Sequence, residues 1–95
     1  MTTDLNYKGY EKYLYESHIK PGRYQYVFRF DNGYGASVIK HAYSYGHEED
    51  LWELAVLEFD HGKEYLCYDT EITDDVIGYL TDKEVCAYLN QIKGL

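Results

Sequence analysis

An aromatic side chain occupies every second position of residues 24–30. The four rings belong to Tyr24, Tyr26, Phe28 and Phe30, and they alternate with Gln25, Val27 and Arg29. A period of two places alternate side chains on one face of a β-strand, so all four rings share a face. Such a face is stable in water only when other elements cover it. This segment therefore requires a sheet with one covered, aromatic face.

The residues that follow predict three further strands. Residues 31–33 read Asp-Asn-Gly, which tolerate the positive φ of a tight hairpin turn, and residues 36–41 form the returning strand. Residues 51–59 carry apolar side chains at both parities, which is typical of a central strand covered on both faces. Residues 60–63 supply a second turn, and residues 64–68 return as a fourth strand.

Near both ends of the chain, the spacing of the residues changes from the period of two typical of strands to the spacing typical of helices. Residues 73–80 begin with a threonine and two aspartates, which predicts a short capped helix. Thr81 and Glu84 then have the spacing of a capping box, and the apolar residues after them lie on one face of an amphipathic helix. Within residues 1–20, tyrosines three apart predict a short N-terminal helix.

Together these elements predict one α+β domain spanning residues 1–95. Residues 1–22 form an N-terminal extension, residues 23–69 a four-stranded antiparallel sheet made of two hairpins, and residues 70–95 a helical segment. We expect the C-terminal helices to pack on one face of the sheet, because an amphipathic helix buries its apolar face in this way.

Charge is divided unevenly along the chain. Residues 1–47 hold six Lys and Arg against four Asp and Glu, whereas residues 48–95 hold three against thirteen. The net charge of −8 thus arises in the second half, which would repel nucleic acid and attract a basic protein surface. The sequence has no apolar run long enough to span a membrane and no signal-peptide pattern at its start, so we expect a soluble, cytoplasmic protein.

The residues that might suggest catalysis or metal binding have simpler interpretations. Residues 47–50 read His-Glu-Glu-Asp, but four consecutive side chains rarely converge on one ion, so a solvated acidic loop is favoured. Residues 69–75 hold four carboxylates, which helix capping and an acidic docking face explain without a substrate. No histidine accompanies a recognisable nucleophile motif. We predict no enzymatic activity, no cofactor, no metal and no catalytic residue.

Two further sets are assigned structural roles. Cys67 and Cys86 lie within apolar patterns and are expected to be buried free thiols, with a disulfide or metal role as the alternative. Basic and aromatic residues interleave in residues 8–29, which resembles a surface for single-stranded nucleic acid, but its weak positive charge argues against direct nucleic-acid binding.

The best candidates for a working surface are tyrosines that neither sheet alternation nor helical spacing explains, together with nearby acids. The glycine-tyrosine segments at residues 32–35 and 43–46 favour turns or a contact surface over a phosphate cradle, which needs a strand-to-helix setting. The predicted binding residues are Tyr34, Tyr43, Tyr45, His47, Glu48, Glu49, Asp50, Asp74 and Asp75.

Several sequence blocks resemble a known group of proteins. The string FDNGYGASVIKHAYSYG, followed by LWELAVLEFD, YDT and ITDDVIGYLTDKEV, is similar to small uncharacterised proteins encoded by tailed phages and prophages. The resemblance covers residues 24–92 and implies a phage accessory gene product in the host cytoplasm. Such products commonly act in host takeover or against host defences.

The predicted function is therefore that of a non-enzymatic phage accessory protein that binds another protein. In its most specific form it is an acidic inhibitor of a host defence nuclease, of the anti-CRISPR type, bound to a host or phage protein with a basic surface. One alternative is a small-ligand or nucleotide-binding protein that uses Tyr34, Tyr43, Tyr45 and His47 as a stacking pocket. Another is a phage morphogenesis or virion component. The oligomeric state stays open.

Overall fold

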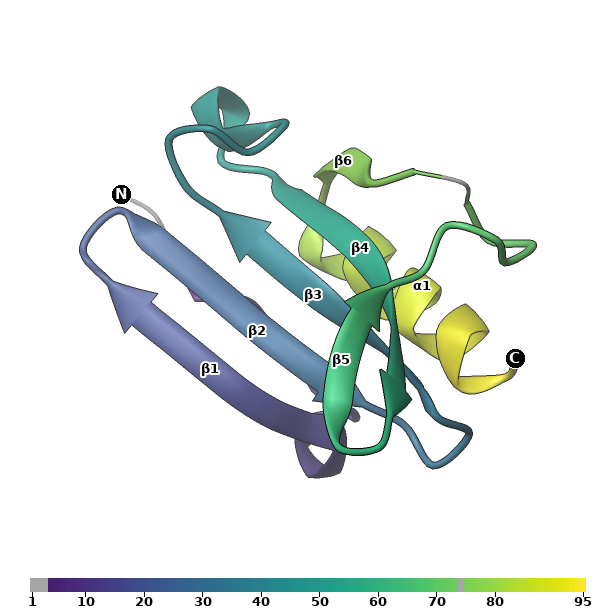
Figure 1. Ribbon diagram of the computed structural model, residues 1–95. Helices are drawn as coiled ribbons and strands as arrows, with labels where there is room; N and C mark the ends of the chain where they lie inside the picture. Colours follow the sequence, from purple (N-terminus) through teal and green to yellow (C-terminus); the bar gives the residue numbers. More distant parts are fainter. Residues whose placement is uncertain (1–3, 74) are drawn as a thin grey trace.

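The computed structural model describes residues 4–73 and 75–95, which form a curled antiparallel sheet and one α-helix (Figure 1). The sheet contains β1 (Leu14–Lys20), β2 (Arg23–Arg29), β3 (Tyr34–Lys40), β4 (Trp52–Asp60), β5 (Lys63–Leu66) and β6 (Ile77–Leu80), and the helix is α1 (Asp82–Lys93). Two short 3-10 helices span Glu11–Tyr13 and His47–Glu49. The predicted α+β class is confirmed.

β4 is the central strand, as predicted from its apolar side chains at both odd and even positions. The strands follow the order β1-β2-β3-β4-β5, and β6 also pairs with β4. β5 pairs with the last part of β4, where Leu57 lies opposite Leu66, while β6 pairs with its first part, where Trp52 lies opposite Leu80. The free edges of the main sheet therefore belong to β1 and β5.

The predicted aromatic face lies within the hydrophobic core. Tyr26, Phe28 and Phe30 are buried on it, next to Val38 of β3 and Trp52 of β4. The register sets Tyr26 opposite Val38 and Phe28 opposite Ala36, which confirms the predicted hairpin. The Tyr26 and Trp52 rings meet edge to face with centroids 5.8 Å apart.

Two elements cover this face. α1 buries Val85, Leu89 and Ile92 in the core, and its start is the predicted capping box of Thr81 and Glu84. The N-terminal segment covers the aromatic rings of β2. The Tyr7 ring lies 5.5 Å from the rings of both Tyr26 and Phe28, and the Tyr13 ring lies 5.0 Å from that of Phe30. The opposite face, which carries residues of the other parity, is called here the helix-free face.

Residues 77–80 correct the prediction of two C-terminal helices. They form strand β6, so α1 is the single α-helix of the described residues. The edge of β4 offers backbone partners to this segment, with Leu54 opposite Ile77. Gly78 also weakens a helix at this point, so strand pairing outweighs the local capping signal. The predicted cap residue Asp74 lies outside the described residues.

The short N-terminal helix predicted within residues 1–20 is wrong for residues 14–20, which form strand β1. The prediction of four strands in two hairpins omitted both β1 and β6. β1 is an exposed edge strand that pairs with β2, with Ser17 opposite Tyr26 and Lys20 opposite Arg23. An edge strand exposed along most of its length has no alternation of apolar and polar residues to reveal it. Residues 14–20 of the expected extension are thus part of the sheet.

Candidate functional site

Three tyrosines stand exposed at one end of the sheet, beside two glutamates. Tyr43 and Tyr45 follow β3 and are 93% and 60% exposed, while Tyr79 of β6 is 57% exposed. With Glu48 and Glu49 they line a shallow pocket of about 210 Å³. These five residues are called the tyrosine surface. All but Tyr79 were predicted as binding residues from the sequence.

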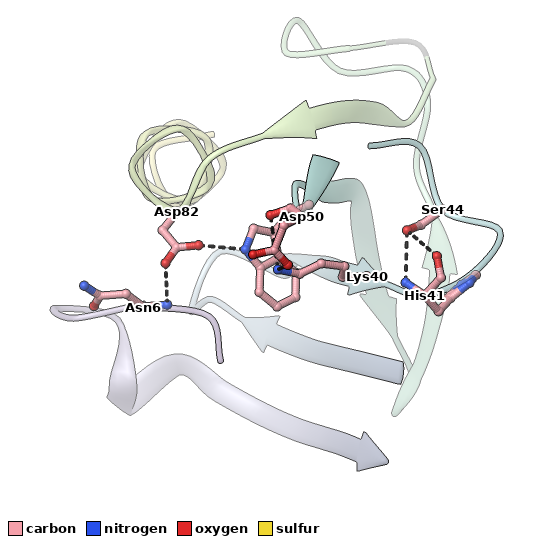
Figure 2. A network of polar contacts seen from close by, with 7 residues as sticks. Asn6, Lys40, His41, Ser44, Asp50 and Asp82 are labelled. Atoms are coloured by element: carbon pink, nitrogen blue, oxygen red, sulfur yellow. Dashed lines mark hydrogen bonds and ion pairs between the residues drawn. The ribbon is translucent and has the colours of Figure 1, made fainter. Parts of the chain in front are cut away.

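Hydrogen bonds fix the loop that carries Tyr43 and Tyr45. The Ser44 hydroxyl accepts a hydrogen bond from the His41 backbone N–H and donates one to the His41 carbonyl, both at 3.0 Å (Figure 2). The Tyr43 N–H donates to Nδ1 of His41 at 3.1 Å, and the Tyr45 N–H donates to Oε1 of Glu53 at 3.0 Å. Because its backbone donors are satisfied, the loop presents its tyrosines from a defined scaffold.

Two glycines allow this loop and β6 to touch through their backbones. A Cβ on Gly78 would lie 2.5 Å from Cβ of Tyr45, and a Cβ on Gly46 would lie 2.9 Å from Cα of Tyr79. The Tyr79 N–H donates to the Tyr45 carbonyl at 3.4 Å. Tyr79 has a φ of 60°, a left-handed conformation that costs free energy for a residue with a side chain. Tyr45 and Tyr79 are therefore held side by side.

Glu48, Glu49 and Asp50 form an acidic run. Its first two residues are exposed, and the third faces inward. Glu48 and Glu49 lie in the 3-10 helix His47–Glu49 and are exposed. Asp50 follows with a φ of 60°, and its Oδ1 lies 2.9 Å from Nζ of Lys40 (Figure 2). Lys40 is only 5% exposed, so Asp50 neutralises a buried ammonium group. Its carboxylate thus has a structural role in addition to the predicted role in binding.

Lys40 belongs to a polar network beneath the tyrosine surface. Its Nζ lies 4.0 Å from the centre of the Trp52 ring, whose Nε1 donates to Oδ1 of Asp82 at 2.7 Å. The other oxygen of Asp82 accepts from the Asn6 N–H at 3.2 Å. Figure 2 shows these residues as one group that joins the N-terminal segment, β3, β4 and α1. The network ties the loop to the hydrophobic core.

His47 begins the 3-10 helix His47–Glu49, is half-buried and also lines the pocket of the tyrosine surface. Its Nδ1 is buried and has no hydrogen-bond partner among residues 4–73 and 75–95. Within the same residues, no group of three or more His, Cys, Asp and Glu side chains is arranged to hold a metal ion.

The structure separates Tyr34 from the other predicted tyrosines. Tyr34 begins β3 and packs partly buried against the core, whereas Tyr43 and Tyr45 follow the last residue of that strand. Seven residues of extended strand measure roughly 20 Å. Asp75 is exposed in the loop before β6, where its N–H donates to the Thr73 hydroxyl at 3.1 Å. Neither Tyr34 nor Asp75 lies on the tyrosine surface, and Asp74 lies outside the described residues.

A second exposed aromatic group lies on β5 and just beyond it. Tyr65, Leu66 and Tyr68 are exposed, and they share a shallow pocket of about 420 Å³ with the acids Glu58, Asp60 and Asp69. Sequence reasoning treated these tyrosines as ordinary sheet residues and missed their exposure. The missing signal is tertiary, because among the described residues β5 pairs with a strand on one side only and all four of its residues are exposed.

Both cysteines are free thiols, as predicted, but only Cys67 is buried. Cys67 is buried and donates to Oδ1 of Asp69 at 3.0 Å. Its burial, reinforced by Asp69, raises the pKa of this thiol above its ordinary value. Burial also raises the pKa of Cys86, which is half-buried. Neither environment favours the reactive thiolate.

No protein-family model, curated protein or solved structure matches this chain. Among the residues that the structure describes, no helix is both long and apolar enough to cross a membrane.

Proposed function

We propose that this chain is a non-enzymatic binding protein whose tyrosine surface docks on a basic surface of another protein. One observation carries the proposal: Tyr43, Tyr45 and Tyr79 are exposed together on a hydrogen-bonded scaffold beside Glu48 and Glu49. Tyrosine is enriched at protein interfaces because its ring buries a large area while its hydroxyl keeps a polar partner. Holding the rings in place before binding lowers the entropy lost on association.

The two glutamates favour a basic partner. They project beside the tyrosines from the half of the chain that holds thirteen acids and three bases. Opposite charge steers encounter and rejects partners of like charge. In its most specific form, the proposal is that of a phage accessory protein that occupies the basic nucleic-acid groove of a host defence nuclease. The resemblance of residues 24–92 to phage and prophage proteins supports this form.

The test compares capture by the wild-type chain and by two single-tyrosine variants. Tagged wild type, Tyr43→Ala and the control Tyr65→Ala are incubated with lysate of an infected host, and bound proteins are identified by mass spectrometry. Tyr65 is an exposed tyrosine of β5 that lies away from the tyrosine surface. We expect wild type and Tyr65→Ala to retain one basic protein that Tyr43→Ala loses.

The captured protein is then purified, and its dissociation constants are measured. Truncating an aromatic anchor weakens binding by about tenfold or more, so Tyr43→Ala should show at least that loss. A partner retained equally by Tyr43→Ala, or lost only with Tyr65→Ala, would assign docking to another surface. For the more specific form, the wild-type chain must inhibit cleavage by the captured nuclease in proportion to occupancy.

A further inference from the structure

A cavity lies on the helix-free face of the sheet. It has a volume of about 510 Å³, within the range of roughly 300 to 1,000 Å³ that small-molecule sites occupy. Ile39 of β3 and Ala55 of β4 form part of its lining, and their parity is opposite to that of Val38 and Val56 in the core. Leu66 at the end of β5 also lines it. Figure 1 shows β5 curling across the end of β4.

Basic side chains outnumber acidic ones in this lining, although Nε2 of His18 already lies 3.2 Å from Oε2 of Glu16. Lys20, Arg23, His18 and His41 line the cavity, and Glu53 is the single carboxylate among its lining residues. Oε1 of Glu53 already accepts the hydrogen bond from the Tyr45 N–H. In a chain with 17 acids and nine Lys and Arg, this bias runs against the overall charge. The cavity therefore favours an anion electrostatically.

The hairpin between β1 and β2 places two of these cations against each other. Lys20 and Arg23 are direct cross-strand partners on either side of the turn. Like charges in this arrangement destabilise a sheet, and an anion between them would relieve the repulsion. Both side chains are exposed, so a ligand can reach them from solvent.

The rest of the lining suits the uncharged body of a ligand. Ile39, Ala55 and Leu66 offer apolar contact, and Tyr68 adds an aromatic ring. Between the apolar and the basic parts, Nε2 of Gln25 donates to Oγ of Ser37 at 3.2 Å. Inorganic anions alone would leave the apolar lining unused.

We propose that this cavity binds a small organic anion that carries a phosphate or carboxylate group on a flat ring. Lys20 and Arg23 hold the anionic group, and the ring lies against Ile39, Ala55 and Tyr68. The cavity shares no lining residue with the pocket of the tyrosine surface, and the test below measures binding to the cavity alone.

The test follows methyl resonances of the intact chain by NMR during titration. The probes are AMP as a ring phosphate, benzoate as a ring carboxylate and inorganic phosphate as charge alone, each added to about 10 mM to reveal millimolar affinity. We expect Ile39 and Ala55 methyls to shift saturably with AMP or benzoate, while Val38 and Val56 methyls on the core side stay unchanged.

Arg23→Gln and a matched control, Lys83→Gln, test the role of the cations. Lys83 is an exposed cation on α1, outside the cavity lining. Arg23→Gln loses one charge-assisted contact, so its affinity for the ring anion should fall by about tenfold. The affinity of Lys83→Gln should equal that of wild type. Unchanged Val38 and Val56 resonances establish that the variant is folded.

Three results would overturn the assignment. The first is the absence of saturable shifts at Ile39 and Ala55 with either ring anion. The second is equal affinity of wild type, Arg23→Gln and Lys83→Gln. The third is inorganic phosphate binding as tightly as AMP and benzoate, since the apolar lining would then contribute nothing.

Discussion

The ammonium group of Lys40 lies 4.0 Å from the centre of the Trp52 ring. This contact places a buried cation against the central strand and leaves Nζ 2.9 Å from Oδ1 of Asp50. The ion pair and the ring together stabilise a charge that would otherwise be costly to bury. They also anchor the acidic run from which Glu48 and Glu49 project.

Removing the charge of Asp50 should destabilise the fold more than replacing Lys40. In Asp50→Asn the buried ammonium loses its carboxylate, which we expect to lower the free energy of unfolding by about 1 to 2 kcal/mol, a moderate value because Asp50 is half exposed. Lys40→Met keeps apolar contact with Trp52 and should stay within about 1 kcal/mol of wild type.

Urea unfolding followed by the fluorescence of Trp52, the single tryptophan, measures both variants. Glu49→Gln, which removes a neighbouring exposed carboxylate, is the control. Equal stabilities for Asp50→Asn and Glu49→Gln would show that the Lys40 ion pair contributes nothing measurable.

Adding one methyl group at Gly78 should disturb the tyrosine surface. The new Cβ would lie 2.5 Å from Cβ of Tyr45, so the loop must move away from β6. We expect Gly78→Ala to lower the free energy of unfolding by roughly 1 to 3 kcal/mol, as overpacking does, and to shift the backbone amide resonances of residues 43–46. Gly94→Ala is the control, because a Cβ there meets nothing closer than 3.6 Å. Unshifted resonances in residues 43–46 would contradict the close contact.

Reversing one charge of the acidic run should weaken docking in a salt-dependent way. With the captured partner, Glu49→Lys is expected to lower the association rate constant by about tenfold at low ionic strength, and the difference from wild type should shrink as salt screens the charges. Glu64→Lys, on β5, changes the net charge equally and serves as the control. Surface plasmon resonance at several salt concentrations measures both. Identical effects of the two variants would point to net charge rather than to the tyrosine surface.

The capping box of α1 should make stability depend on pH in acid. Hydrogen bonds from the Thr81 backbone and side chain lower the pKa of Glu84, so its charged form favours the folded state. This contribution is present above the unfolded pKa of about 4.3 and is lost as pH falls through the lower folded value.

Wild type should therefore exceed Glu84→Gln in stability at pH 7, and the two should converge as pH falls below the lowered folded pKa of Glu84. Thr81→Ala removes the cap itself and should cost about 1 kcal/mol at pH 7. Circular dichroism during urea unfolding at each pH gives these values, with Glu64→Gln as the control. A difference between wild type and Glu84→Gln that persists unchanged to acid would refute the role of the charge.

The structure also explains which parts of the site were predictable. Tyr43, Tyr45, Glu48 and Glu49 stand in a short loop whose turn residues are visible in the sequence. Tyr79 joins them only because β6 pairs with β4 and Gly78 meets Tyr45. Asp50 is adjacent to exposed acids in sequence, yet it points to a buried lysine on another strand. Such contacts depend on residues distant along the chain, which local patterns do not record.

Local patterns in the sequence are sufficient to predict the hairpin of β2 and β3, the central position of β4 and the start of α1. In each case the deciding forces are local: alternation of apolar side chains, positive φ at the turn, and side chains that cap nearby backbone groups. Tertiary structure decided that residues 77–80 form a strand, because the open edge of β4 offers them backbone partners. It also decided that exposed residues 14–20 join the sheet, since pairing with β2 satisfies their backbone groups without requiring an apolar face.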